Sequence, residues 1–268
     1  MPAQVHPTAV VSQAAVLADD VVVGPFTVLD GRVTLAAGVV VGPHCHLVGE
    51  LHVGAGCRFH AGCVIGDAPQ HLGYTNEPTR TVIGERCIFR EHVTVHRAMP
   101  GGETRIGSDC FLMAGSHVAH DCVVGDAVVL ANGALLGGHV TVGDRAFLSG
   151  NTAVHQFCRV GRLAMLGGTS AVTQDLPPFW VAQGGVNRAR GVNVVGMRRA
   201  GVSREEITAV RKAYRLLNLA GRTIPDALAE VEAAHGHLPA VVELAAFYRT
   251  TKRGVVTARM AGDDAASE

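Results

Sequence analysis

Residues 106–172 read IGSDCF LMAGSH VAHDCV VGDAVV LANGAL LGGHVT VGDRAF LSGNTA VHQFCR VGRLAM LGGTSA VTQ, and each block of six opens with an aliphatic residue. A small or β-branched residue follows four positions later. A six-residue period held over so many blocks fits neither an α-helix, with a period of about 3.6, nor an alternating strand, with a period of about 2. Hexapeptide repeats of this kind predict a mainly β protein, a parallel β-helix.

The same period starts near the N-terminus, at Val5, and holds to Ile65. Three hexads make one triangular coil of 18 residues, and coils stack about 4.8 Å apart. Residues 67–80 (DAPQHLGYTNEPTR) lack the aliphatic openers and contain two prolines, so they predict a loop that leaves the prism. Insertions in repeat proteins gather on the binding face, although a plain surface excursion is the alternative.

The sequence divides into a β-helix over 1–177, an irregular connector over 178–200, a small helical domain over 201–256 and a disordered tail over 257–268. The paired prolines in TQDLPPFW end the repeat, because proline cannot continue a hydrogen-bonded ladder. Ser203 and Glu206 form a capping box before the first expected helix, and two further helices are expected over 224–236 and 238–254.

Charge and hydropathy indicate which classes of binding partner the sequence favours. The net charge is zero, so nothing global favours nucleic acid or a membrane, and no apolar run approaches the roughly 18 residues that span a bilayer. The N-terminus lacks a signal peptide pattern, so we expect a cytoplasmic protein. Residues 188–253 carry 12 Arg and Lys against 6 Asp and Glu, which indicates an anionic partner for this region.

All seven cysteines occupy the fifth position of a hexad, where Ala, Val, Thr and Ser otherwise stand. No C-x-x-C motif is present. We therefore expect small buried fillers rather than metal ligands or catalytic thiols.

Stacking the coils brings four histidines to one edge. Counted from Ile106 with an 18-residue coil, His117 falls at position 11, His120 at 14, His139 at 15 and His155 at 13. Gly138 then lies over His120, and Gln156 over Gly138.

Three interpretations of this edge are open. Asp121 can orient His120 as a general base beside a glycine N–H that acts as an oxyanion donor, the arrangement that acyl transfer needs. The histidines can instead bind zinc, as three histidines do in carbonic anhydrases built on hexapeptide β-helices. They can also be polar surface residues without chemistry.

Several longer motifs are more specific than the hexads. They are EPTR (77–80), REHVTVHR (90–97), GSHVAHDCVVG (115–125), LANGALLGGHVTVGD (130–144), NTAVHQF (151–157), QGGVNRARGVNVVGMRRAG (183–201) and SREEITAVRKAY (203–214). With them the chain resembles the UDP-N-acetylglucosamine O-acyltransferases, the first acyltransferases of lipid A biosynthesis. The resemblance implies a left-handed β-helix, a homotrimer with active sites between subunits, and transfer of a 3-hydroxyacyl group from acyl carrier protein to the glucosamine 3-position, with no cofactor and no metal.

The resemblance also implies roles for residues. His120 matches the general base, Asp121 its supporting carboxylate, Gly138 the backbone oxyanion donor and Gly168 the residue that sets acyl length. The positions that it implies for substrate binding are Gln70, His71, His96, His117, His139, His155, Gln156, Asn193 and Arg199.

The chain departs from the family in the regions that recognise the acceptor. Residues 71–73 are His-Leu-Gly where the family commonly has Asp-Leu-Lys, and no lysine precedes Lys212. Val195 replaces a glutamate, and Ala200 replaces an arginine. The acceptor can therefore be the N-acetylglucosamine nucleotide, its 3-amino analogue or another sugar nucleotide, and a homologue without catalysis is a further alternative.

Overall fold

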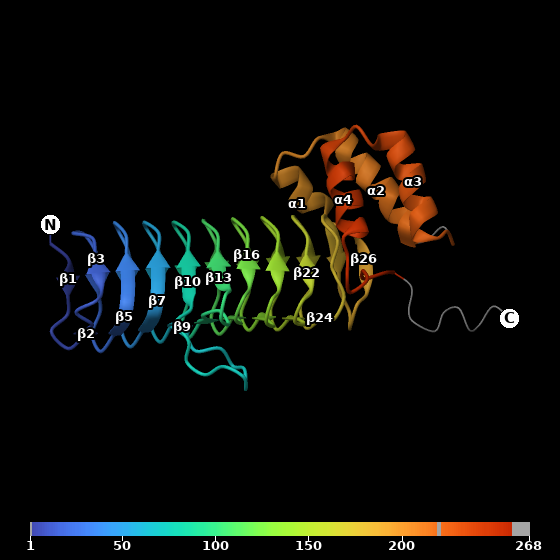
Figure 1. Ribbon diagram of the computed structural model, residues 1–268. Coiled ribbons are helices and arrows are strands. Elements are labelled where there is room, and N and C mark those ends of the chain that lie inside the picture. The colour runs from blue at the N-terminus through green and yellow to red at the C-terminus, as the bar shows by residue number, and fades with distance from the viewer. Residues whose placement is uncertain (1, 219–220, 259–268) are drawn as a thin grey trace.

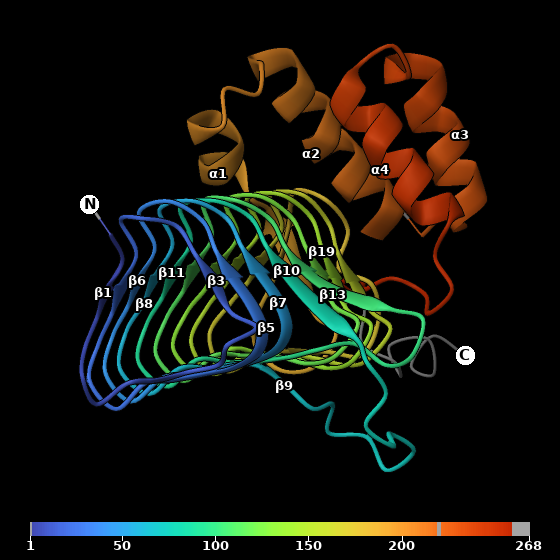
Figure 2. The same ribbon diagram turned by 60° about the vertical axis from the view of Figure 1, so that its left-hand side comes forward.

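The computed structural model describes residues 2–218 and 221–258, which form a left-handed parallel β-helix followed by a small group of helices (Figure 1). The β-helix has three faces, which Figure 2 shows nearly end-on. Face A consists of β1 (Gln4–Val5), β4 (Val22–Val23), β6 (Val40–Val41), β8 (Arg58–Phe59), β11 (Ile88–Phe89), β14 (Phe111–Leu112), β17 (Val129–Leu130), β20 (Phe147–Leu148), β23 (Met165–Leu166) and β25 (Trp180–Ala182).

The other two faces share the long strands β5 (Val28–Leu35) and β7 (His46–Val53), which pass from one face to the next. Face B further holds β2 (Val10–Val11), β9 (Val64–Asp67), β12 (Thr94–His96), β15 (His117–Val118), β18 (Leu135–Leu136), β21 (Ala153–Val154) and β24 (Ala171–Val172). Face C further holds β3 (Val16–Leu17), β10 (Arg80–Ile83), β13 (Glu103–Ile106), β16 (Val123–Val124), β19 (Thr141–Val142) and β22 (Arg159–Val160). We call the turns between faces the A–B, B–C and C–A edges.

The hexad openers fill the interior of the prism, as the period predicts. Leu112 pairs with Leu130, and Leu130 pairs with Leu148, so stacked residues are 18 apart in sequence. All seven cysteines are free thiols and buried, in agreement with their expected role as fillers. One aliphatic column and one column of small side chains therefore make up the core.

The edges use a backbone conformation that the period does not reveal. Non-glycine residues with positive φ recur there, among them Asp121 (59°), His139 (60°) and Phe157 (64°). Such a conformation costs roughly 1–2 kcal/mol for a residue with a Cβ atom. At Asp121 this conformation accompanies a contact with the side chain of the preceding residue, His120, at the site described below.

Two insertions interrupt the coils on the way to the site. Val53 pairs with Ile83, a separation of 83 − 53 = 30 residues, because residues 68–79 leave the prism as the expected loop (Figure 2). Ile83 then pairs with Ile106, a separation of 106 − 83 = 23, because residues 97–102 form a shorter excursion.

The prediction of an irregular connector over 178–200 was wrong, because this range contains two strands and a helix. Strand β25 pairs in parallel with β23, so the β-helix continues past residue 177, and β26 (Ala189–Val192) pairs antiparallel with β25. Met165 pairs with Val181, 181 − 165 = 16 residues on, so the last coil is two residues short. The paired prolines lie in the turn before β25, where no ladder N–H is required, and they do not block the strand.

Four helices follow: α1 (Val194–Arg199), α2 (Arg204–Asn218), α3 (Ile224–His235) and α4 (Pro239–Arg249). They lie against one side of the C-terminal end of the β-helix (Figure 1). The capping box is present, since the Glu206 N–H donates to Ser203 Oγ at 3.1 Å and the Ser203 N–H donates to the Glu206 carboxylate at 3.2 Å. Helix α4 ends at Arg249 rather than near residue 254.

Most of the tail expected to be disordered, residues 259–268, lies outside the described residues. Among the described residues, no helix combines the length and the apolar character needed to cross a bilayer.

Candidate active site

His120 and Asp121 form a hydrogen-bonded pair on the B–C edge. His120 Nδ1 and Asp121 Oδ2 are 2.7 Å apart, and both side chains are about nine-tenths buried. The positive φ of Asp121 permits this contact, because consecutive side chains in a regular strand point to opposite faces. An ionised carboxylate only accepts hydrogen bonds, so Nδ1 carries the proton and Nε2 keeps its lone pair.

The short excursion at 97–102 holds Asp121 in place. The Met99 N–H donates to Asp121 Oδ2 at 3.0 Å, and the Asp121 N–H donates to Thr104 Oγ1 at 2.8 Å. A Cβ atom on Gly102 would lie 1.9 Å from Asp121 Oδ1, so only glycine fits there. The sequence pattern did not identify these residues as supports of the site.

Gly138 lies directly against the His120 ring, as the 18-residue arithmetic predicts. A Cβ atom at position 138 would be 2.7 Å from both His120 Cε1 and Nε2. Within residues 2–218 and 221–258, no acceptor binds the Gly138 N–H. A free backbone donor therefore lies in the coil next to the lone pair of the imidazole.

His139 extends the site along the edge. Its ring centroid is 5.2 Å from that of His120, and its Nε2 is 3.8 Å from Asp121 Oδ2. Phe157 stacks on the His139 ring, with 4.5 Å between the ring centroids. Two imidazoles therefore lie beside the Asp121 carboxylate, and of the two only that of His120 is within hydrogen-bond distance.

Two more predicted histidines lie on face B beside this edge. The rings of His96 and His117 are 4.8 Å apart, and His117 Nδ1 is 2.7 Å from Thr94 Oγ1. Burial, reinforced by the neighbouring histidines, lowers the pKa of His117 to about 4. Burial also lowers the pKa of His96. Both rings are therefore neutral near pH 7, and they offer hydrogen bonds rather than charge.

The remaining predicted residues of this edge are exposed. Gln156 occupies the same column as Gly138 one coil further on, and its carbonyl oxygen is 3.1 Å from His155 Nδ1. On the loop, the ring centroid of His71 lies 5.7 Å from that of His120. Gln70 is exposed, and its side chain has no partner among the described residues.

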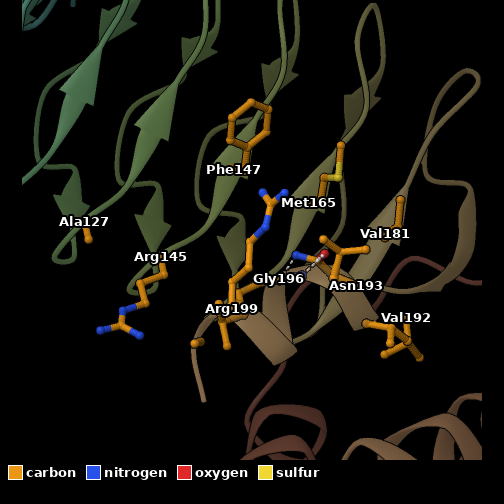
Figure 3. A pocket seen from close by; sticks show the side chains of 13 residues that line it. Ala127, Arg145, Phe147, Met165, Val181, Val192, Asn193, Gly196 and Arg199 are labelled. Atoms are coloured by element: carbon orange, nitrogen blue, oxygen red, sulfur yellow. Dashed lines mark hydrogen bonds between the residues drawn. The ribbon is translucent and has the colours of Figure 1, made fainter. Parts of the chain in front are cut away.

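Asn193 and Arg199 do not join His120 within one chain. They line a cavity of about 860 Å³ at the C–A edge and on face A, with Arg145, Phe147 and Met165 (Figure 3). The Asn193 side chain caps α1, since its Oδ1 accepts from the Gly196 N–H at 2.9 Å. Its Nδ2 donates to the Leu163 carbonyl at 2.9 Å, which ties the start of α1 to the β-helix. Gly168 lies on the A–B edge and is exposed.

The side chains that could hold a metal ion at this edge are two histidines and one carboxylate. Among the described residues, the potential ligand atoms of His120, Asp121 and His139 lie within 4.8 Å of one another, whereas His117 and His155 are outside this group. A site of three histidines, the basis of the zinc interpretation, is therefore not formed within the described part of one chain.

Comparison with known proteins extends over most of the chain. The family described as "Udp N-acetylglucosamine O-acyltransferase; Domain 2" matches residues 175–256, and the bacterial transferase hexapeptide family matches 103–138. A relative from Anaeromyxobacter sp. (strain Fw109-5), named acyl-[acyl-carrier-protein]–UDP-N-acetylglucosamine O-acyltransferase, is 43% identical over 202 residues. These residues are 75% of this chain and 79% of the relative.

Solved structures of UDP-N-acetylglucosamine acyltransferases are also similar to this chain. The UDP-N-acetylglucosamine O-acyltransferase from Moraxella catarrhalis superposes with a TM-score of 0.89 at 34% identity, over 94% of this chain and 99% of its own. The corresponding enzyme from Campylobacter jejuni gives a TM-score of 0.89 at 32% identity, over 96% of this chain and 100% of its own. The chain is thus an acyltransferase, and it belongs to the UDP-N-acetylglucosamine O-acyltransferase family.

Proposed function

We propose that this protein transfers a 3-hydroxyacyl group from acyl carrier protein to the 3-hydroxyl of UDP-N-acetylglucosamine, with His120 as general base. The observation that carries the proposal is the His120–Asp121 pair, which leaves His120 Nε2 free beside Gly138 of the next coil. The Anaeromyxobacter relative is named for an acyl carrier protein donor and this sugar nucleotide acceptor, which supports the choice of substrates.

In the proposed reaction, His120 Nε2 takes the proton of the sugar hydroxyl as its oxygen attacks the thioester carbonyl. The Gly138 N–H stabilises the negative charge that develops on the carbonyl oxygen. The intermediate then collapses, the carbon–sulfur bond breaks, and the proton held by His120 passes to the leaving thiolate. Asp121 stabilises the imidazolium between the two steps. The thioester supplies the activation, so no cofactor is required.

The positions of Asn193 and Arg199 support a homotrimer with sites shared between subunits. On one chain they lie at the C–A edge, whereas His120 lies at the B–C edge. The outward-facing residues of face A are largely apolar, as expected of a surface that a second copy covers. They include Val22, Val40, Ile88, Phe111, Val129, Phe147, Met165 and Val181.

Co-expression of His120→Ala with Arg199→Ala tests whether sites are shared. We expect each variant alone to be impaired, and the mixed assembly to recover well above either parent. Random mixing leaves about one quarter of the sites intact, since each site draws on two independently chosen copies. Activity of the purified, doubly tagged assembly is the measurement. Activity that stays at the level of the parents would mean that the two residues do not act across a subunit boundary.

A basic surface on α1 and α2 suits an acidic carrier protein. Its arginines form no ion pair within the described part of the chain; they are Arg198, Arg199, Arg204, Arg211 and Arg215. Arg198, Arg204 and Arg211 line one open groove of about 550 Å³. Unpaired cations around a groove attract an anionic partner and accelerate its association.

We expect the KM for acyl carrier protein to rise several-fold between about 50 and 200 mM salt, because the charges involved are exposed and screened. Replacing Arg204 and Arg211 with alanine should raise this KM at low salt and flatten its salt dependence. Arg222→Ala is the matched control, since Arg222 already pairs with Glu230. A KM that is independent of salt would rule out electrostatic docking.

Gly168 is expected to set the acyl length, because a glycine leaves room that a side chain would fill. A Cβ atom at position 168 would come no closer than 3.5 Å to any atom of its own chain, so substitution is tolerated by the fold. We expect Gly168→Met to shift the preferred donor to a shorter acyl chain. Competition between donors of different length measures the shift, and an unchanged preference would remove Gly168 from this role.

The acceptor itself requires a direct assay, because residues 71–73 differ from the family pattern. Purified protein should be tested with UDP-N-acetylglucosamine, its 3-amino analogue and other sugar nucleotides. We expect transfer to the first; transfer only to the amino analogue would make the product an amide and correct the proposed acceptor. A cytoplasmic location stays a prediction from the sequence.

A further inference from the structure

We propose that Cys122 is a positioning residue for the oxyanion donor: its thiol binds the carbonyl of Gly137 and thereby orients the peptide whose N–H belongs to Gly138. The inference rests on the proposed function, because it concerns the donor that acyl transfer would use. It adds a role in catalysis to a buried thiol that the sequence pattern predicts to be a filler.

The contact joins one coil of the β-helix to the next. The Cys122 S–H donates to the Gly137 carbonyl at 3.2 Å, across 137 − 122 = 15 residues. Within residues 2–218 and 221–258, no other donor reaches this carbonyl oxygen. Cys122 is fully buried, and burial raises the pKa of its thiol to about 12. The sulfur therefore keeps its proton at neutral pH and acts as a donor.

A planar peptide transmits this contact to Gly138. The Gly137 carbonyl and the Gly138 N–H belong to one peptide group, and in a trans peptide the two bonds point in opposite directions. Because Cys122 binds the carbonyl from the core, the N–H is turned away from the core, toward the outside of the B–C edge. This N–H has no acceptor among the described residues. The thiol consequently fixes the direction of a donor that is free to bind a ligand.

The same contact recurs on other edges of the β-helix. The Cys110 S–H donates to the Gly125 carbonyl at 3.1 Å, again 125 − 110 = 15 residues on. The Thr27 hydroxyl donates to the Gly42 carbonyl at 2.6 Å over the same separation. A thiol or hydroxyl at the fifth position of a hexad can therefore hold the peptide of a turn in the next coil.

On the C–A edge, a peptide held in this way binds an anionic oxygen. The peptide that accepts from Cys110 donates through the Asp126 N–H to Asp144 Oδ1 at 2.9 Å. The turn at Gly138 has Gln156 at the corresponding place, 156 − 138 = 18 residues on, and in the described part of the chain the Gln156 side chain makes no such hydrogen bond. The negatively charged oxygen of the reacting thioester would thus take the position that a carboxylate takes on the C–A edge.

Kinetics of three substitutions at Cys122 test the inference. Cys122→Ala and Cys122→Val remove the donor, with less and with more volume than the thiol, and Val140 already stands in the same buried column. We expect both to lower kcat roughly two- to fivefold, the size of one weak hydrogen bond, and to leave the KM for the sugar nucleotide unchanged. The reason is that the donor acts on charge that develops in the transition state. Cys122→Ser should restore kcat, since the Thr27 hydroxyl makes the same contact.

Cys110→Ala is the matched control. Cys110 is as deeply buried as Cys122 and loses the same kind of contact, but the N–H of its peptide is already bound by Asp144. This variant should keep kcat and lose about as much thermal stability as Cys122→Ala. NMR of the labelled protein without substrate gives a second readout. The Gly138 amide proton should shift in Cys122→Ala, return toward its original position in Cys122→Ser and stay unchanged in Cys110→Ala.

The outcomes separate this inference from the proposed function. Suppose that the unmodified protein transfers the acyl group. An unchanged kcat in Cys122→Ala or Cys122→Val, or an equal loss in Cys122→Ser or Cys110→Ala, then overturns the positioning role alone. If the unmodified protein transfers no acyl group, the proposed function is overturned, and with it the use of Gly138 as oxyanion donor.

Discussion

Replacing His120 with alanine is expected to lower turnover roughly 100- to 10,000-fold while the β-helix stays folded. The reason is local: His120 Nδ1 lies 2.7 Å from Asp121 Oδ2, which leaves Nε2 for the proposed role as base. The fold should survive, because the Met99 N–H still satisfies Asp121 Oδ2 and the hexad core does not include His120. Steady-state kinetics with circular dichroism measure both effects.

His52→Ala is the matched control for this experiment. His52 also lies on the β-helix, but on the outer side of face C, away from the B–C edge. Its replacement should leave kcat unchanged. Near-normal turnover of the His120 variant would show that another group accepts the proton, and the proposed mechanism would fail.

Replacing Gly138 with alanine is expected to lower turnover roughly 100- to 1,000-fold, comparable with the loss of an oxyanion donor. A Cβ atom there would stand 2.7 Å from Cε1 and Nε2 of His120, so the ring must move or the substrate oxygen loses its place. The backbone does not require glycine at this position, since Gly138 is not among the glycines with positive φ. Kinetics of the variant at saturating substrate provide the measurement.

Gly150→Ala provides a steric control on another edge. The nearest atom to an added Cβ there is the Asn132 carbonyl oxygen at 3.5 Å, an ordinary contact. This control should retain both fold and activity. If Gly138→Ala were equally harmless, the close approach of Gly138 to the base would have no part in catalysis.

The period of six predicted both the fold and the central column of the site. Because the coil length is 18, sequence positions alone placed Gly138 on His120, and the structure confirms this contact. The period could not predict what happens inside a turn. The positive φ of Asp121, which lets adjacent side chains bond, recurs at the edges but is not visible in the period. The support from Met99 and Gly102 comes from an insertion that breaks the repeat.

Periodicity also says little beyond the prism. The paired prolines predict the end of the repeat, yet they occupy a turn, and β25 adds another strand to face A. Asn193, predicted to bind substrate, caps α1 through Oδ1 and donates from Nδ2 to the Leu163 carbonyl. Arg199 and His120 lie on different edges of the chain, and the repeat, which describes neighbours within one coil stack, gave no position for Arg199.

The most direct measurement is product analysis after incubation of the purified protein with 3-hydroxyacyl carrier protein and UDP-N-acetylglucosamine. Mass spectrometry and NMR should show one acyl group esterified to the sugar 3-oxygen, formed by the unmodified protein and not by His120→Ala. An ester at a different position, equal product from both proteins, or no transfer to this acceptor would contradict the account.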